Sequence, residues 1–366
     1  MAVLAGAVVT AVIQSSSAST VMVIGFVNAG LLTLVQSIGI IFGANIGTTI
    51  TAQIIAFDVT SITMPAIIIG LLMLFISWKY LRGWGETVLG FGLLFFGMTL
   101  MSSELKSIAD FPTFIRFFSS FDCAPVNGWM PPGALLGAIG IGLAVTMIVQ
   151  SSSAATGIIL ALGASGLINL YTAVALVLGS NIGTTVTAQL AAIPTNRIAK
   201  QAALAHTMFN CIGVLLIGAT FYIRWGDSGV PVFFYLIDSI TTGDAFAAIP
   251  QNVPRHIANA HTVFNVITTL VLLPFTTGLA RFCEWMIPVK KETLKFQHLE
   301  PHLLDNPSIA LEQAAICYGG MLRESWSMIS QAVEDHFVKC EITEEETAEF
   351  EKREKNIDNL QFEITN

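Results

Sequence analysis

Long apolar stretches alternate with short polar interruptions along the first 286 residues of the chain. Six of these stretches are long enough to cross a bilayer as helices, because a spanning helix needs about 20 residues. They are residues 31–56, 61–78, 87–103, 168–193, 200–222 and 257–283. The pattern therefore predicts an all-α polytopic membrane protein.

One further apolar stretch is interrupted by a short polar segment. Residues 133–149 are apolar and rich in glycine, residues 150–153 are polar, and apolar residues then continue to Leu162. Each arm is about half a span, so we expect a re-entrant helical hairpin with the polar residues at its tip. Irregular backbone at membrane depth is tolerated only where protein or a water-filled cavity satisfies it.

The polar tip belongs to an internal repeat with a constant offset of 136 residues. The sequence QSSSAST at 14–20 recurs as QSSSAAT at 150–156, and GANIGTT at 43–49 recurs as GSNIGTT at 179–185. Three predicted spans separate Gly30 from the equivalent Gly166. Because an odd number of crossings places these two points on opposite faces, we expect two inverted repeats, each with a re-entrant hairpin and broken helices.

The repeat defines the expected domain organisation. The transmembrane domain at 1–286 contains repeat one at 1–80, repeat two at 87–223 and an extra helix at 257–283, and a short helical tail follows at 287–366. Met1 aligns with Gly137, so the helix before the second hairpin has no counterpart in the first half. Either the sequence is a fragment, or this first element is dispensable.

Composition and charge support a membrane protein with a polar tail. Only 11% of the residues are charged and 54% are hydrophobic, whereas a soluble domain carries about 25% charged residues. This excludes a disordered chain, a nucleic-acid-binding protein and an ordinary cytosolic enzyme. Residues 1–285 have no net charge, and residues 286–366 carry a net charge of −8. The basic residues of the loops are slightly more numerous on the face of the tail, which predicts a cytoplasmic tail.

The four repeated motifs place hydroxyl and amide side chains in otherwise apolar spans, and they contain no Lys, Arg, Asp or Glu. Oxygen atoms in series suit a hard cation, whereas hydroxyls and the free N–H groups of a broken helix suit an oxyanion. Without a charged side chain, the charges of the bound ligands must balance each other. A phosphate anion held next to Na⁺ satisfies this condition.

Structural roles remain open for the same residues. Ser and Thr side chains commonly join membrane helices by hydrogen bonds, and the motif glycines could permit either a kink or a close helix approach. A shorter echo, AHTMFN at 205–210 and AHTVFN at 260–265, places His206 and His261 four residues before an asparagine on one helix face. Each histidine either makes an interhelical hydrogen bond or is a pH-sensitive group near the transport path.

These motifs resemble the type II sodium/phosphate cotransporter family over about residues 1–285. The resemblance implies sodium-coupled symport of inorganic phosphate, with the two hairpin tips meeting near the membrane centre and Na⁺ as the coupling ion. It implies phosphate and sodium contacts at Gln14, Ser15, Ser16, Ser17, Gln150, Ser151, Ser152 and Ser153. It also implies flanking helix breaks, with further oxygens for sodium, at Asn45, Thr48, Thr49, Asn181, Thr184 and Thr185.

The tail resembles the start of a PhoU-like helical regulatory domain, as carried by bacterial members. Apolar residues at helical spacing over Leu311–His336 predict one helix, and Glu344–Phe362 predicts a second, charged helix. The resemblance implies a location in the cell membrane and a phosphate-signalling partner for the tail. The alternative is a solvated cytoplasmic helical bundle.

Other functions compete with symport. A passive phosphate channel or exporter, regulated by the tail, would use the same site without the same coupling. A phosphate sensor would rely on the tail itself. A membrane enzyme with a Ser–His pair is disfavoured, because the chain has no GxSxG elbow and its serines occur in repeated runs without a local base. The pattern makes no prediction of the oligomeric state.

Overall fold

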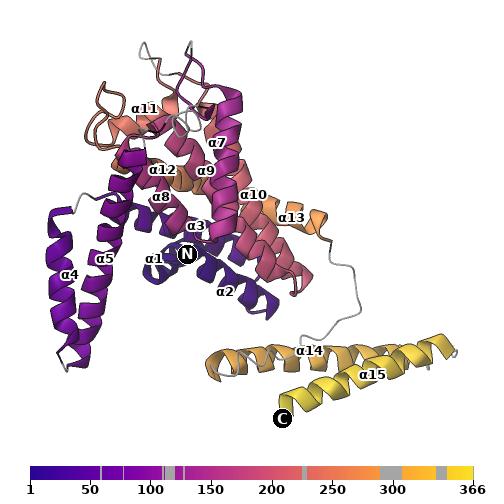
Figure 1. Cartoon of the computed structure of the whole chain (residues 1–366). Helices are drawn as coiled ribbons and strands as arrows, with labels where there is room; N and C mark the ends of the chain where they lie inside the picture. Colours follow the sequence, from indigo (N-terminus) through magenta and orange to yellow (C-terminus); the bar gives the residue numbers. More distant parts are fainter. Residues whose placement is uncertain are drawn as a thin grey trace.

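The computed structural model describes residues 1–57, 60–76, 78–108, 111, 120–126, 128–224, 229–288, 307–334 and 344–365. This part of the chain is helical, and its β pairing is confined to the isolated bridges Val126–Trp129 and Arg224–Pro231 (Figure 1). Six of its helices are long and apolar enough to cross a membrane.

The helices follow the internal repeat. The first half contains α1 (Ala2–Ile13), α2 (Ser16–Asn28) and α3 (Leu34–Ile55), and the second half contains α7 (Pro132–Val149), α8 (Ser152–Ser165) and α9 (Leu170–Ala192). Between them lie α4 (Thr60–Leu74) and α5 (Lys79–Ile108). After them come α10 (Arg197–Thr220), α11 (Val232–Ser239), α12 (Val253–Leu272), a 3₁₀ turn (Leu273–Phe275) and α13 (Thr276–Met286). The tail forms α14 (Pro307–Glu334) and α15 (Glu344–Thr365).

Three predicted lengths need correction. The helix expected at 61–78 is the 15-residue α4, which is too short to count among the six candidate spans. The span expected at 257–283 is present and longer, from Val253 to Met286, and a 3₁₀ turn at Leu273–Phe275 separates its parts α12 and α13, because Pro274 lacks the N–H that a continuous α-helix requires. The arm expected to be a half-span at 133–149 is the 18-residue α7, which is long enough to cross.

Glycines bring the first arm of each hairpin into backbone contact with the long helix of the same half. A Cβ atom on Gly43 of α3 would overlap the carbonyl oxygen of Val3 in α1. At the equivalent Gly179 of α9, it would overlap the carbonyl oxygen of Ile139 in α7. Of the two roles open to the motif glycines, the structure therefore shows the close helix approach.

The two halves interlock. Helix α2 packs against α9 of the other half, and α8 packs against α3. Phe42 of α3 and Phe209 of α10 lie side by side in the core, with ring centroids 4.6 Å apart. At the end of α2, Asn28 Oδ1 accepts a hydrogen bond from the backbone N–H of Asn196 at 2.7 Å. Each hairpin is thus held by residues of both halves.

The segment before α7 is anchored on the start of α9. The backbone N–H of Cys123 donates to Thr172 Oγ1 at 3.0 Å, and Asn169 Nδ2 donates to Asp122 Oδ1 at 2.6 Å. Cys123 is free and buried. Burial raises the pKa of its thiol to about 11, so the thiol is protonated at neutral pH.

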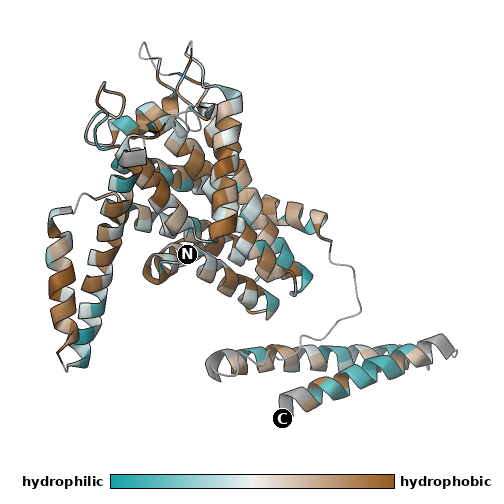
Figure 2. Ribbon diagram, in the orientation of Figure 1, coloured by the Kyte–Doolittle hydropathy of each residue, from teal (hydrophilic) through white to brown (hydrophobic). Residues whose placement is uncertain are grey.

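Hydrophobic residues occur along most of the helices that precede the tail (Figure 2), and many large apolar side chains among them are exposed, as expected for a multi-pass membrane protein. They are prominent on α4, where Ile68 and Leu72 are exposed, and on α5, where Trp84 and Leu93 are exposed. In the tail, α14 and α15 form the helices predicted there and are joined by Arg353, which pairs with Glu324 and donates to Gln331 at 2.9 Å.

Replacing Gly179 with alanine should destabilise the protein, because the added methyl group would force α9 away from α7. Overpacking of this kind costs about 1–3 kcal/mol, so we expect a lower melting temperature in detergent. Gly140→Ala is the matched control, since nothing lies within 4 Å of a Cβ atom there. Equal melting temperatures for the two variants would contradict the close packing of α7 on α9.

Candidate functional site

The two hairpins break at the same residue of the repeat. Gln14 ends α1 with φ 58° and ψ 25°, and Gln150 ends α7 with φ 55° and ψ 23°. This left-handed conformation is uncommon outside glycine and is typical of strained functional positions. The backbone N–H of each glutamine still bonds to a threonine carbonyl four residues earlier, at 2.8 Å in both halves. The predicted helix–break–helix pattern is therefore present in each half.

A serine begins the second arm of each hairpin. The backbone N–H of Ala18 donates to Ser15 Oγ at 3.2 Å, and the N–H of Ala154 donates to Ser151 Oγ at 3.2 Å. Ser15 and Ser151 are thus the N-caps of α2 and α8. The first N–H groups of a helix carry partial positive charge and attract anions, so each tip presents a helix N-terminus.

The two tips meet. Ser16 Oγ and Ser152 Oγ, which are equivalent atoms of the two halves, lie 3.3 Å apart, and both side chains are buried. Ser17 and Ser153 are half-buried beside them, whereas Gln14 and Gln150 are exposed. The structure therefore brings the eight predicted tip residues into one region.

Two threonines that were not among the predicted site residues contact the first tip. Thr51 of α3 donates to Gln14 Oε1 at 2.7 Å, and the equivalent Thr187 of α9 donates to Ser17 Oγ at 3.3 Å. Both lie within the extended match of the repeat, three residues after Thr48 and Thr184. Helical spacing from these predicted residues is the sequence signal that points to them.

The predicted flanking helix breaks are wrong. Helix α3 runs unbroken through Asn45, Thr48 and Thr49, and α9 runs unbroken through Asn181, Thr184 and Thr185. The threonine hydroxyls donate to carbonyls three or four residues earlier at 2.8–2.9 Å, so the helix satisfies them internally. Asn45 likewise donates to Ile41 O at 2.8 Å.

The two asparagines of these motifs, Asn45 and Asn181, face α10 and α12, which are named here the histidine helices because they carry His206 and His261. His261 Nε2 lies 2.9 Å from Asn181 Oδ1, and Asn210 Nδ2 donates to Asn45 Oδ1 at 3.4 Å. The interhelical hydrogen bond considered for His261 is therefore present. His206 and His261 are both buried, and the Nδ1 atom of each has no partner in the described part of the chain.

Buried polar atoms without partners gather on these helices. Besides the two Nδ1 atoms, they include Asn181 Nδ2, Asn210 Oδ1 and Asn265 Oδ1. Buried groups of this kind are normally met by water or an ion. The described residues contain no group of three or more His, Cys, Asp or Glu able to hold a metal ion.

The halves differ at one buried hydrogen bond near the tips. Thr146 Oγ1 of α7 donates to Ser180 Oγ of α9 at 2.8 Å. In the first half Ala44 replaces Ser180, and the equivalent Thr10 Oγ1 is buried without a partner among the described residues. The second hairpin is therefore tied to its long helix by a bond that the first hairpin lacks.

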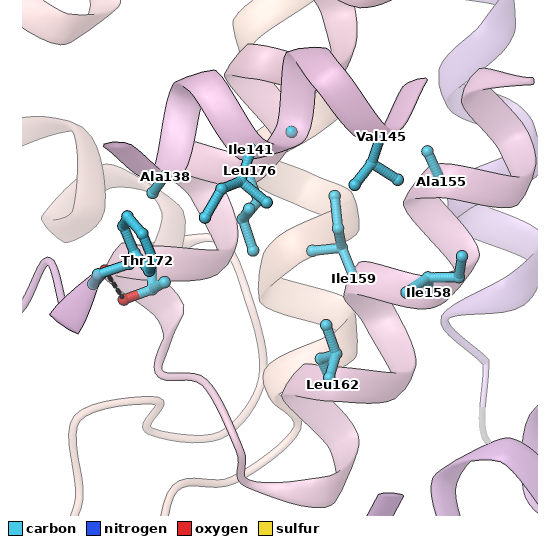
Figure 3. Close-up of a pocket in the computed structure, with 11 residues that line it drawn as sticks. Ala138, Ile141, Val145, Ala155, Ile158, Ile159, Leu162, Thr172 and Leu176 are labelled. Carbon is cyan, nitrogen blue, oxygen red and sulfur yellow. Dashed lines mark hydrogen bonds between the residues drawn. The ribbon is translucent and has the colours of Figure 1, made fainter. Parts of the chain in front are cut away.

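A small apolar pocket between α7, α8 and α9 does not fit an anion (Figure 3). Its volume is about 70 Å³, and Thr172 is the only residue with a polar side chain that lines it. The Thr172 hydroxyl already donates to Phe121 O at 3.5 Å. None of the eight predicted tip residues lines this pocket.

Comparison with known proteins identifies relatives over most of the chain. A family model described as Na⁺/Pi-cotransporter matches residues 1–103 and 133–228. The uncharacterized protein YqeW of Bacillus subtilis is 34% identical over 291 residues, which are 77% of this chain and 83% of YqeW. No solved structure matches the chain.

Two relatives have names that refer to phosphate. YjbB of Escherichia coli, whose name proposes inorganic phosphate export, is 30% identical over 320 residues, which are 86% of this chain and 54% of YjbB. The match thus spans about half the length of YjbB. The sodium-dependent phosphate transport protein 2C of Rattus norvegicus is 48% identical over 93 residues, which are 24% of this chain and 15% of the rat protein.

Exchanging the residues that differ between the halves should change stability in opposite directions. Ser180→Ala leaves the Thr146 hydroxyl unmet and should cost about 1–3 kcal/mol, whereas Ala44→Ser gives Thr10 a partner and should contribute about 0.5–1.5 kcal/mol. Melting temperatures of the detergent-solubilised variants measure both effects. If Ala44→Ser lowers the melting temperature as much as Ser180→Ala, the two positions are not equivalent.

Proposed function

Because the chain belongs to the Na⁺/Pi-cotransporter family, we propose that it carries inorganic phosphate across the cell membrane together with sodium. The observation that carries this proposal is the contact of Ser16 with Ser152 at 3.3 Å, which joins two capped helix N-termini. Hydroxyl and N–H donors converge there. A phosphate anion, which is rich in acceptors, fits such a site.

Sodium balances the charge of the phosphate. No charged side chain lies in the four motifs, and an uncompensated charge at bilayer depth costs about 2.5–3.5 kcal/mol or more. Helix N-termini and hydroxyls supply only partial charge. Neutral oxygens of Gln14, Gln150 and the neighbouring serines and threonines bind Na⁺ beside the anion. Each ligand then raises the affinity for the other by the same factor.

The proposed arrangement in the membrane is two inverted repeats. The hairpins α1–α2 and α7–α8 are re-entrant, with their tips near the midplane, as in other transporters built from inverted repeats. In this arrangement α3 and α5 cross the membrane and the 15-residue α4 crosses as a shorter third helix, so that the two halves have opposite orientations. Residues 1–286 form the transport domain.

The tail, residues 287–366, lies in the cytoplasm in this proposal. Helices α14 and α15 pair through Arg353 and Glu324, as expected for part of a PhoU-like helical domain that contacts a phosphate-signalling partner. His206 and His261 remain the groups proposed to sense pH, because each is buried with one ring nitrogen unpartnered among the described residues.

Phosphate export is the second candidate function. The name of the Escherichia coli relative favours it, and the same tip site would bind the anion in either direction. The two functions differ in their dependence on the sodium gradient, because only symport requires that Na⁺ drives uptake.

Labelled phosphate uptake into proteoliposomes distinguishes the two. With Na⁺ outside we expect accumulation of phosphate above its external concentration, since the sodium gradient supplies the driving force. K⁺ or choline outside should support only the leak seen in protein-free vesicles. Equal uptake in the three salts would reject symport and favour the channel or exporter.

Phosphate binding should depend on both the salt and the tip serines. Calorimetry on detergent-solubilised protein should show tighter binding in NaCl than in KCl. Ser16→Ala or Ser152→Ala should weaken binding about ten- to a hundred-fold in NaCl, since an unmet hydrogen bond costs about 1–3 kcal/mol.

Ser165→Ala is the matched control for these variants. Ser165 lies at the far end of α8, and its hydroxyl donates to Leu162 O at 2.9 Å. This variant should bind phosphate as the parent protein does. Parental binding by both tip variants would place the phosphate elsewhere.

A further inference from the structure

Helices α10 and α12 hold the ends of α9 and α3 through the same hydrogen bond. Gln189 Nε2 of α9 donates to Thr207 Oγ1 of α10 at 2.8 Å. Gln53 Nε2 of α3 donates to Thr262 Oγ1 of α12 at 2.8 Å. The two glutamines are 136 residues apart, and the two threonines follow the histidines of the AHT echo, 55 residues apart. The Gln–Thr hydrogen bond between α9 and α10 therefore recurs between the corresponding residues of α3 and α12.

The two contacts differ in strength. Gln53 Nε2 also donates to Asn259 Oδ1 at 3.1 Å, and Arg255 Nη1 donates to the backbone oxygen of Gln53 at 3.1 Å. The guanidinium of Arg255 also lies 4.3 Å from the ring centroid of Phe57, just beyond the end of α3. Gln53, Asn259, Thr262 and Arg255 are named here the α3 latch.

The corresponding contact on α9 is weaker because of two residue differences. Leu204 stands 55 residues before Asn259, and Lys200 stands 55 residues before Arg255. A leucine side chain cannot accept a hydrogen bond, and within the described part of the chain the Gln189 amide donates to Thr207 alone. Gln189 and Thr207 are named here the α9 latch.

Both latches lie next to the residues that contact the hairpin tip. Gln53 follows Thr51 by two residues, and Thr51 donates to Gln14 at 2.7 Å. Gln189 follows Thr187 by two residues, and Thr187 donates to Ser17 at 3.3 Å. A helix end that is released from its latch therefore also loses its position at the tip.

One groove lies beside the α3 latch, and a second lies at the start of α10, where no residue of α9 lines it. A groove of about 530 Å³ is lined by Ile55, Ala56 and Phe57, which directly follow the α3 latch, and by the start of α12. A groove of about 640 Å³ is lined by Ile198 and Gln201 at the start of α10. Val253 of the first groove is the repeat counterpart of Ile198 in the second, so the grooves occupy related places at the two histidine helices.

We propose that Gln53 and Gln189 are positioning residues of two gates, and that Asn259 makes the α3 gate the firmer of the two. This inference rests on the proposed transport function, in which the site opens to one side at a time. The α9 end, held by a single side-chain bond, releases first. The difference between Asn259 and Leu204 therefore sets which side opens more readily.

Exchange of these two residues between the helices tests the inference in the whole protein. Backbone hydrogen exchange reports local opening, and the segments to follow are 50–57 and 186–193. In the parent protein, exchange should be slower in 50–57. Asn259→Leu also removes the bond from Asn259 Nδ2 to Thr241 Oγ1. In 50–57 it should speed hydrogen exchange about two- to ten-fold, the range for the one hydrogen bond that Gln53 loses. Leu204→Asn should slow exchange in 186–193 by a similar factor.

The double variant that carries both Asn259→Leu and Leu204→Asn is decisive. In it, hydrogen exchange should become slower in 186–193 than in 50–57, the reverse of the parent protein. If these residues have a merely structural role, hydrogen exchange should become faster in both segments. A uniform change at both ends, or no change at either, would overturn the inference. If Asn259→Leu does not fold, two other variants test the inference. Thr207→Val should speed hydrogen exchange in 186–193 more than Thr262→Val speeds it in 50–57, because Gln53 still bonds to Asn259. Equal effects of the two variants would overturn the inference.

Phosphate uptake by the same variants separates this inference from the proposed function. Each exchange variant should alter the turnover of uptake more than the affinity for phosphate, because both latches act on opening. Absence of sodium-coupled uptake in the parent protein would reject the proposed function, whereas the hydrogen-exchange rates of the two segments could still be compared. Parental turnover in a variant whose exchange pattern is reversed would overturn the gating role.

Discussion

Backbone N–H groups that lie away from water need partners inside the protein, and the two hairpin tips are where this constraint acts most strongly. Gln14 and Gln150 reverse the chain in the left-handed region, and Ser15 and Ser151 each satisfy one N–H of the following helix. The other N–H groups of that first turn have no carbonyl of their own helix to bond. Two such turns facing each other concentrate donors where the chain has no basic side chain.

The position of the tips depends on how closely their supporting helices approach. Gly43 and Gly179 permit α1 and α7 to lie in backbone contact with α3 and α9. That contact brings the later residues of the long helices to the depth of the tips, where Thr51 and Thr187 donate to Gln14 and Ser17. The glycines therefore set the position of the tips through packing.

Some of this structure could be predicted from the sequence and some could not. The helix breaks at Gln14 and Gln150 were predictable, because a polar run that interrupts an apolar stretch at the same place in both repeats is typical of a hairpin tip. The unbroken course of α3 through Thr48 was not, since a threonine has the same hydroxyl whether it caps a break or bonds to its own helix. The division of the last apolar stretch was signalled by Pro274.

For the candidate site, too, the sequence predicted some residues and missed others. Ser16 and Ser152 were predicted, and the structure places them in contact. Thr51 was within the matched sequence, but nothing in a one-dimensional pattern distinguishes a threonine that reaches a neighbouring hairpin from one that does not. Contacts between elements distant in sequence, such as Thr187 with Ser17, require the packing of the two halves to be known.

The contact of Ser16 with its own counterpart Ser152 has an evolutionary consequence. Two identical half-length chains, paired about a two-fold axis, could make the same contact without any covalent link between them. Fusion of the two genes then releases each half from the requirement of identity. Ala44 stands where the second half has Ser180, and this is a position at which the fused halves have diverged, so that only the second half has the bond from Thr146.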